Sequence, residues 1–291
     1  MADTTDARAC HGRPRVLIIN ADDFGMSAGI NRGILEAVAA GVVTSASLMV
    51  NMPASDDATH AACAVGSTLS VGLHLTLTAG RPLTTAESLV DPETGEFFPL
   101  PRLLVRALGG QIRSGSVVEE CQAQIARLRG AGLKITHLDG HQHVHVLPVI
   151  AGAVRRVVAR ENIPVVRRPA EALLRGDHWW RRLPQRFVIR TLSLGAWMRP
   201  WPAATTDHFM GGTLLGAPDF EAALVRLLDH LPPGTTELMV HPGYARAPLP
   251  GNDAYVVQRE AELRALLSPA VRARLDSNRI ALISFAQLRP T

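Results

Sequence analysis

The chain has 291 residues, 47% of them hydrophobic, and a formal net charge of +4. This length suits one large α/β barrel or two smaller domains, and the composition excludes a disordered or fibrous protein. The lack of a long basic tract argues against a nucleic-acid partner, and Lys134, as the only lysine, disfavours Schiff-base chemistry.

The cysteines and the N-terminal region bear on where the protein works. Cys10, Cys63 and Cys121 are far apart and form no CxxC pair, so the sequence indicates neither a zinc knuckle nor a disulfide framework. Residues 1–13 are polar and lack the apolar segment of a signal peptide, and no apolar run is long enough to span a membrane. We therefore expect a cytoplasmic protein with a flexible tail over residues 1–13.

Short apolar runs alternate with amphipathic segments along the rest of the chain. Ser27 is a suitable N-cap for a helix that ends at Gly41, and the Pro- and Gly-rich composition of residues 80–100 predicts a loop. The apolar patterns predict strands over residues 16–20, 45–50, 70–77, 134–139, 163–168, 237–241 and 280–284. Further helices are predicted over residues 117–129, 149–159, 220–230 and 260–267.

The alternation of strands and helices predicts an α/β fold with a parallel sheet. About seven strands in a chain of this length favour a (β/α) barrel over two doubly wound halves. We expect a single domain over residues 14–291, with residues 170–210 as a helical excursion from the barrel.

The adjacent carboxylates of Asp22 and Asp23 directly follow the first predicted strand. Unpaired charge at such a place is costly to bury, and a bound cation would neutralise it. The alternative is that both residues cap the N-terminus of the following helix. Because neighbouring side chains in an extended chain point apart, we expect one carboxylate to bind a metal ion and the other to stay free to transfer protons.

Four histidines, His137, His141, His143 and His145, stand close together in THLDGHQHVH, with Asp139 among them. Imidazole is the commonest metal ligand in proteins. Alternate positions in an extended segment would place several imidazoles on one face. The segment therefore predicts a metal or catalytic site, although the pattern does not show which histidine is a ligand.

Three other polar residues, His74, Arg167 and His241, also lie on predicted strands or at their ends. His74 lies on the polar face of an alternating strand, and Arg167 and His241 lie at the ends of two others. A structural role would explain each of them alone. Together with Asp22–Asp23 and His141 they come from five strand ends, which meet at one face of a parallel barrel. Two histidines and one carboxylate would leave coordination positions open, as in catalytic metal sites.

All four tryptophans and five arginines fall within residues 178–202, interleaved with apolar residues. Three interpretations stay open. The segment could pack on the barrel or on a second subunit of a homodimer. It could instead form a sugar-stacking or lid surface, or lie on a membrane surface.

The motifs NADDFGMSAGINRGILEA, VGLHLTLTAGRPL, THLDGHQHVH, HFMGG, VHPGY and QREAELRALL, in this order, resemble those of the YdjC-like carbohydrate deacetylases. That family includes chitooligosaccharide deacetylases and hopanoid-biosynthesis deacetylases, and the resemblance extends from residue 14 to residue 288. It implies a distorted TIM-like barrel and a metal-dependent hydrolase that removes acetyl from an N-acetylated amino sugar.

The resemblance also implies roles for single residues. Asp23, His74 and His141 match the family's ligands for one divalent ion, magnesium or zinc. Asp22 matches the general base and His241 the general acid.

Other site residues receive supporting roles. Arg167 matches a site arginine of the family. Asp139, His143 and His145 are expected to orient ligands or to contact substrate.

The expected partner is an N-acetylated oligosaccharide or glycolipid, and a lipid-linked substrate at a membrane surface stays open. The alternatives are another metal-dependent hydrolase, acting on phosphoesters or non-sugar amides, and a non-catalytic sugar- or metal-binding protein. A base and an acid candidate together argue against the latter.

Overall fold

The computed structural model describes residues 13–172, 182–246 and 248–288. The tail predicted for residues 1–13 therefore lies, apart from Arg13, outside the described residues. Seven strands form one parallel sheet in the described part of the chain. They are β1 (Arg15–Phe24), β2 (Ser45–Leu48), β3 (Ser70–Leu75), β4 (Ile135–Gly140), β5 (His208–Met210), β6 (Gly234–Val240) and β7 (Ala281–Leu282).

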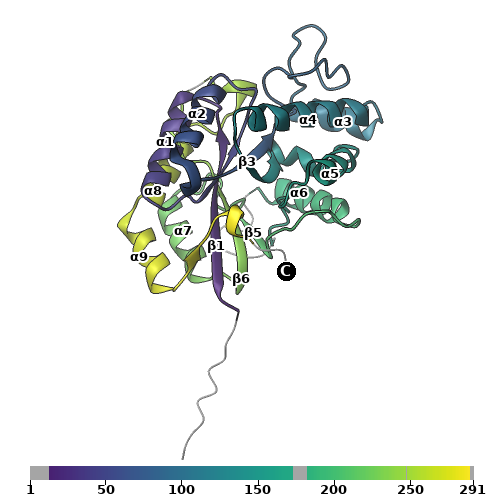
Figure 1. Ribbon diagram of the computed structural model, residues 1–291. Helices are drawn as coiled ribbons and strands as arrows, with labels where there is room; N and C mark the ends of the chain where they lie inside the picture. Colours follow the sequence, from purple (N-terminus) through teal and green to yellow (C-terminus); the bar gives the residue numbers. More distant parts are fainter. Residues whose placement is uncertain (1–12, 173–181, 247, 289–291) are drawn as a thin grey trace, which may run out of the picture.

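The strand order is β4-β3-β2-β1-β6-β5, with β7 paired to the first part of β1. The sheet curls into a half-barrel, which confirms the predicted α/β barrel-like class (Figure 1). Because β1 is central, it is buried from Leu17 onward, and its first part is an apolar run.

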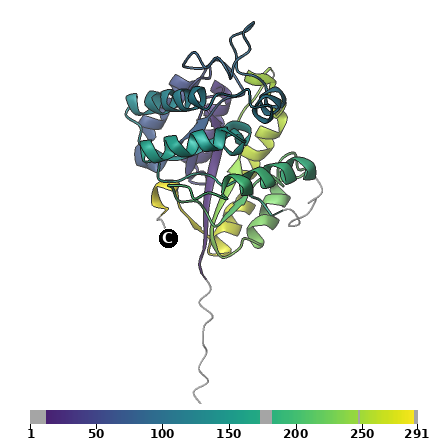
Figure 2. The same ribbon diagram turned by 90° about the vertical axis from the view of Figure 1, so that its right-hand side faces the viewer.

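Helices cover the outside of this sheet. They are α1 (Ala28–Ala39), α2 (Ser55–Val65), α3 (Leu100–Leu108), α4 (Ser114–Gly130), α5 (Ile150–Glu161), α6 (Leu183–Ala196), α7 (Phe220–Asp229), α8 (Val257–Leu266) and α9 (Pro269–Ser277). The teal helices α4 and α5 lie on the opposite side from the yellow-green C-terminal helices (Figure 2). As predicted, the Ser27 hydroxyl caps α1 by accepting the Ile30 N–H at 3.3 Å.

The strand predicted over residues 163–168 is wrong as a continuous element. It makes only two single parallel bridges, from Val166 to Leu138 and from Val165 to Ala204. Pro164 has no N–H to give to a ladder, which limits the pairing. The segment nevertheless joins β4 to the chain just before β5.

Four elements were not predicted. Helix α2 has many alanines and a weak apolar stripe, α3 begins where the proline-rich loop ends, and β5 is too short to show a period. The fourth element is α9, which follows its N-cap Ser268.

Part of the tryptophan-rich segment is described. The rings of Trp197 and Trp201 stack with centroids 4.8 Å apart and pack against the core. Phe187 and Met198, by contrast, are exposed. Trp179 and Trp180 lie outside the described residues. None of the helices described is long and apolar enough to cross a membrane.

Helix α1 packs unusually close to the loop that follows β6. A Cβ atom added at Gly33 would lie 2.6 Å from the Cα of Gly243, and the Tyr244 N–H donates to the Gly29 carbonyl at 3.1 Å. Only glycine allows this approach at residue 33. The contact fixes the loop that begins with His241.

We expect Gly33→Ala to lower the free energy of unfolding by about 1–3 kcal/mol, because the added methyl group overpacks this contact. Gly152→Ala in α5 is the matched control, since a Cβ there meets nothing within 4 Å. It should raise stability by a few tenths to about 1 kcal/mol through helix propensity. Denaturant unfolding followed by circular dichroism measures both values, and equal shifts would contradict this view of the contact.

Candidate metal centre and active site

The two carboxylates at the end of β1 converge on one histidine. Asp23 has a φ of 66°, and the pairing of β1 with β2 is irregular between Ala21 and Phe24. The His74 Nε2 lies 3.3 Å from Asp23 Oδ1 and 4.0 Å from Asp22 Oδ2. The expected divergence of the two side chains is therefore wrong, because a left-handed residue breaks the alternation of the strand.

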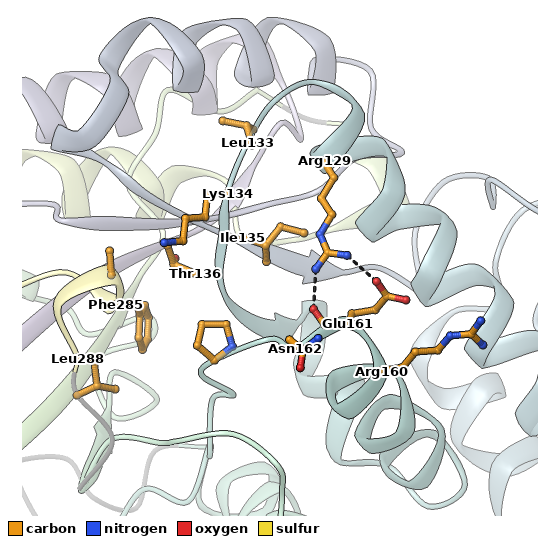
Figure 3. A pocket seen from close by; sticks show the side chains of 12 residues that line it. Arg129, Leu133, Lys134, Ile135, Thr136, Arg160, Glu161, Asn162, Phe285 and Leu288 are labelled. Carbon is orange, nitrogen blue, oxygen red and sulfur yellow. Dashed lines mark hydrogen bonds and ion pairs between the residues drawn. The ribbon is translucent and has the colours of Figure 1, made fainter.

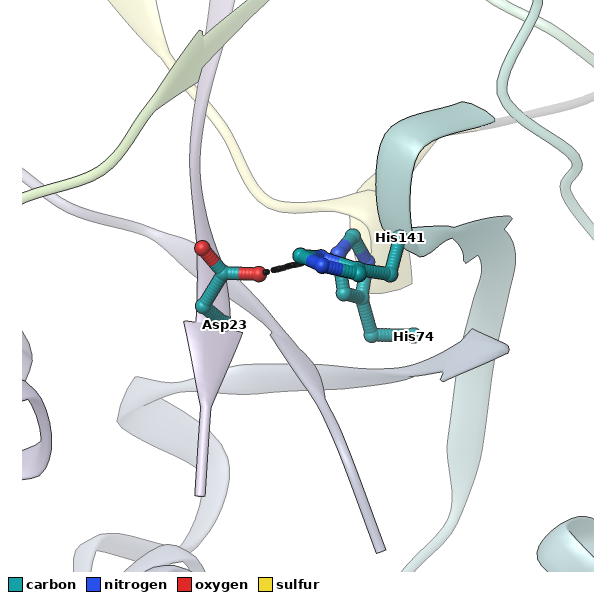
Figure 4. Close-up of side chains that lie close together, drawn as sticks. All are labelled: Asp23, His74 and His141. Atoms are coloured by element: carbon teal, nitrogen blue, oxygen red, sulfur yellow. Dashed lines mark hydrogen bonds and ion pairs between the residues drawn. The ribbon is translucent and has the colours of Figure 1, made fainter. Parts of the chain in front are cut away.

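Asp23, His74 and His141 form a group that could hold a metal ion. Each offers one ligand atom, and these atoms all lie within 4.8 Å of one another (Figure 4). His141 Nδ1 is 2.9 Å from Asp23 Oδ1. All three side chains are buried, and they come from β1, from β3 and from the residue directly after β4.

Asp139 orients His74 within this group. The two residues are partners in the β3–β4 register, and His74 Nδ1 donates to Asp139 Oδ1 at 2.7 Å. The Ser47 hydroxyl donates to the other carboxylate oxygen of Asp139 at 2.7 Å. His74 Nε2 is thereby directed toward Asp23, and a carboxylate at the other ring nitrogen is the arrangement that supports imidazole ligands in metal sites.

The surroundings of these ligands favour positive charge. Burial lowers the pKa of His74, but the carboxylates of Asp139 and Asp22 outweigh it and raise that pKa to about 10. Burial raises the pKa of Asp23, yet Arg259 and His141 hold it well below its usual value. Ionised carboxylates and a site for one cation are what a divalent ion requires, so the donor set fits a metal.

Arg167, like Arg259, is among the largest fully buried side chains of the described residues, and it contacts three carboxylates. It donates to both oxygens of Asp22 at 2.6 and 2.7 Å, to Asp139 Oδ2 at 2.7 Å and to Glu237 Oε1 at 2.6 Å. A second group, comprising Asp22, His74 and Asp139, also has ligand spacing. The Arg167 guanidinium already supplies the positive charge there.

Glu237 and Asn20 were missed by the sequence reasoning. Burial raises the pKa of Glu237 to about 7 although Arg167 opposes the shift. The Asn20 amide donates to Asp22 Oδ1 and to the Ser47 hydroxyl, both at 2.8 Å. Both residues lie within β1 or β6, where a polar residue among apolar ones was the available signal.

The histidines of THLDGHQHVH do not share one face. Residues 141–146 form a 3₁₀ turn, and Gln142 and His143 have positive φ angles of 53° and 57°. The face expected for an extended segment is therefore wrong. His145 Nε2 donates to the Arg167 carbonyl oxygen at 3.0 Å, while the His143 ring packs against Phe209.

Burial favours the neutral form of His137, His143 and His145. Burial lowers the pKa of His145 to about 4 and that of His143 well below its usual value. Burial also lowers the pKa of His137 to about 3, and its ring stacks on Phe285 with centroids 4.0 Å apart. Among the described residues, none of the three belongs to a group with metal-ligand spacing.

His241 directly follows β6, and Asp22 directly follows Ala21, which pairs with Val240 in the register of β6 and β1. Its side chain is 14% exposed, more than those of His74 and His141. Its backbone N–H donates to Glu262 Oε2 at 2.6 Å. Base and acid candidates therefore stand at neighbouring strand ends.

Arg259 of α8 is a further buried cation that the sequence reasoning did not identify. Its NH2 group donates to Asp23 Oδ2 and to Asp253 Oδ2, each at 2.7 Å. The motif QREAELRALL contains it, but a charged residue in an amphipathic helix gives no sign that it points inward. Asp23 thus has one oxygen held by Arg259 and the other directed at the two histidines.

A cavity of about 590 Å³ lies at the opposite end of β4 (Figure 3). Lys134, Thr136, Arg160 and Phe285 line it among others. None of the ligand, base or acid candidates contributes to its wall. It is separate from the site at the carboxyl ends of the strands.

Two carbohydrate deacetylases are similar in sequence to this chain over most of its length. It is 37% identical to a carbohydrate deacetylase of Geobacillus stearothermophilus, over 94% of this chain and 98% of the relative. It is 35% identical to a carbohydrate deacetylase of Mus musculus, over 94% of this chain and 96% of the relative.

A solved structure shares the fold. It is a proposed cellobiose-phosphate cleavage protein of Enterococcus faecalis V583, with a TM-score of 0.72 and 25% identity over 94% of this chain and 98% of that one. The family model described as YdjC-like protein matches residues 16–277. The chain therefore belongs to the YdjC-like family.

Proposed function

We propose that the protein is a metal-dependent carbohydrate N-deacetylase, which hydrolyses the acetamide of an N-acetylated amino sugar to acetate and a free amine. The observation that carries this proposal is the placement of Asp22 and His241 at neighbouring strand ends, beside the group of Asp23, His74 and His141. Two relatives named carbohydrate deacetylase, which match almost the whole chain, support it.

Asp23, His74 and His141 would hold one divalent ion, magnesium or zinc. When bound, such an ion polarises the acetamide carbonyl and lowers the pKa of water. Two imidazoles and a carboxylate would leave coordination positions for both the acetamide carbonyl oxygen and a water molecule. Arg259 holds Asp23 through its Oδ2 atom, and Asp139 holds His74 through its Nδ1 atom, so that the other oxygen and the other ring nitrogen are available to the ion.

Asp22 accepts the proton of the attacking water at one particular atom. Its Oδ1 already accepts from Asn20 and from Arg167, at 2.8 and 2.7 Å. Its Oδ2 accepts only from Arg167 in the described structure, at 2.6 Å, and faces His74. The free lone pair of Oδ2 therefore lies on the side of the metal ligands, where a water molecule would be activated.

His241 supplies the proton that the amine needs in order to leave. An amine anion is a very poor leaving group, so hydrolysis of an amide requires a general acid. His241 and Asp22 each follow a paired residue of two adjacent strands, and the greater exposure of His241 suits contact with the sugar. His143, with an unpartnered Nδ1 atom, is a candidate contact for the substrate.

A screen of N-acetylated oligosaccharides and glycolipids by mass spectrometry tests this function. We expect loss of one acetyl group with release of acetate, abolished by chelation and restored by added zinc or magnesium. Including lipid-linked substrates tests the membrane-surface interpretation at the same time. Phosphate release from phosphosugars without acetate release would instead make the protein a phosphoesterase.

Changes to the two carboxylates should separate their roles. Asp22→Asn keeps the side-chain shape but cannot take a proton, so we expect retained metal and turnover lower by about 10²- to 10⁴-fold. Asp23→Asn and His74→Ala should lose metal affinity first, and excess metal should partly restore activity. Metal analysis and kcat are compared with His60→Ala, a change at an exposed histidine of α2. Loss of metal or full activity in Asp22→Asn would overturn these assignments.

Replacing the acid should have an effect that depends on the leaving group. His241→Ala should keep its metal and lose turnover of the acetamide by about 10²-fold or more, because the amine must leave unprotonated. An acetyl ester with a nitrophenolate leaving group needs no such proton and should lose much less. Equal losses of kcat on both substrates would indicate that His241 binds substrate rather than donating a proton.

A further inference from the structure

Glu262 is a buried carboxylate to which the proposed chemistry assigns no task. It lies on the inner side of α8 and is 1% exposed. Its Oε2 accepts the His241 backbone N–H at 2.6 Å, and its Oε1 accepts the Tyr255 hydroxyl at 2.5 Å. In the described part of the chain, its one ion-pair partner within 4.0 Å is His241.

The His241 ring is directed at this carboxylate. Its Nδ1 atom lies 3.9 Å from Glu262 Oε1 and has no hydrogen-bond partner in the structure. Because the two ring nitrogens stand on different edges of the imidazole, Nδ1 toward α8 leaves Nε2 turned away from it. Hydrogen bonds of catalytic groups are often long without substrate, so a small rotation would bring Nδ1 to Glu262.

Tyr255 holds the carboxylate in this position. Its hydroxyl binds Glu262, and its ring meets the His241 ring edge-on with centroids 5.5 Å apart. Arg259 in turn binds the Tyr255 carbonyl oxygen through Nε at 2.7 Å, and its own carbonyl oxygen accepts the Gly243 N–H at 3.2 Å. The loop that carries His241 is thus attached to one turn of α8 at several points.

The same helical turn reaches the other half of the site. Arg259 and Glu262 are three residues apart and therefore lie on one face of α8. Arg259 contacts the candidate metal ligand Asp23, whereas Glu262 contacts His241. The motif QREAEL thereby fixes the distance between the metal ligand and the acid.

We propose that Glu262 is a positioning residue for His241, with Tyr255 as its clamp. The proposal rests on the proposed function, in which His241 is the acid. A carboxylate at Nδ1 orients an imidazole and stabilises its protonated form, as the aspartate does in Ser-His-Asp triads. Glu262 acts through His241 and does not itself touch the substrate.

A double-mutant cycle tests this. Glu262→Gln keeps the shape and removes the charge, and we expect kcat on the acetamide to fall by about 10- to 100-fold, with KM and metal content unchanged. In the His241→Ala background the same change should cost nothing further, because its target is gone. Glu260→Gln is the matched control, since Glu260 is on the same helix and exposed.

Several outcomes would overturn the positioning role. An equal fall in kcat in both backgrounds would show a general structural effect, and an unchanged kcat in Glu262→Gln would show no role at all. If Glu262→Gln does not fold, Tyr255→Phe replaces it, because the ring remains and only the hydroxyl that holds Glu262 is lost. Tyr255→Phe should lower kcat by a smaller factor, and this decrease in kcat must also disappear in the His241→Ala background.

Unfolding measurements separate this proposal from the proposed function. If the wild-type protein releases no acetate from any sugar, the deacetylase proposal fails. The free energy of unfolding can still be measured for the wild type, Glu262→Gln, His241→Ala and the double variant. A non-zero coupling between Glu262→Gln and His241→Ala would support the contact, and additive effects would reject it.

Discussion

Buried negative charge is the constraint on which the architecture of this site depends. Asp22, Asp23, Asp139 and Glu237 all lie inside the half-barrel, away from solvent. Removing carboxylates from water without partners is prohibitively costly. Arg167 contacts three of them, and their negative charge raises its pKa well above the usual value although burial alone would lower it.

The group of Asp23, His74 and His141 also contains a buried negative charge, that of Asp23. Arg259 contacts only the outer oxygen of Asp23, and the inner oxygen faces two imidazoles. A cation or a proton near this inner oxygen would balance its charge, and the spacing of Asp23, His74 and His141 suits such a cation. Losing either arginine would leave a buried charge uncompensated, at a cost of about 3–5 kcal/mol.

The sequence predicted most of the fold because buried strands of a parallel sheet contain unbroken apolar runs, as in residues 16–19. It also predicted the ends of the strands that carry His74 and His241 to within two residues, whereas β1 extends to Phe24, beyond its predicted end, so that Asp23 lies within it. It could not predict the left-handed φ of Asp23 or the turn at Gln142 and His143, because such strain shows only in the backbone.

Long-range partners were equally hidden from the sequence. Arg167 was identified, yet nothing in IPVVRR shows that it binds Asp22, 145 residues away. Arg259 and Glu262 look like the charged residues of any amphipathic helix, and only the packing of α8 against β1 and the loop after β6 reveals that they point inward. Polar residues inside a barrel lack a periodic pattern, so pairwise contacts must be seen in three dimensions.

The backbone of His241 is held by contacts that do not involve its ring nitrogens. Its Nδ1 has no hydrogen-bond partner, and the ring meets the Tyr255 ring edge-on. Its backbone, however, is fixed by Glu262 on one side and by the glycine contact between Gly33 and Gly243 on the other. A fixed backbone would suit the acid role that we propose for His241, because it keeps the ring beside Glu262 and Tyr255. The close approach of α1, which glycine alone allows, is therefore part of the active site although no atom of α1 needs to touch the sugar.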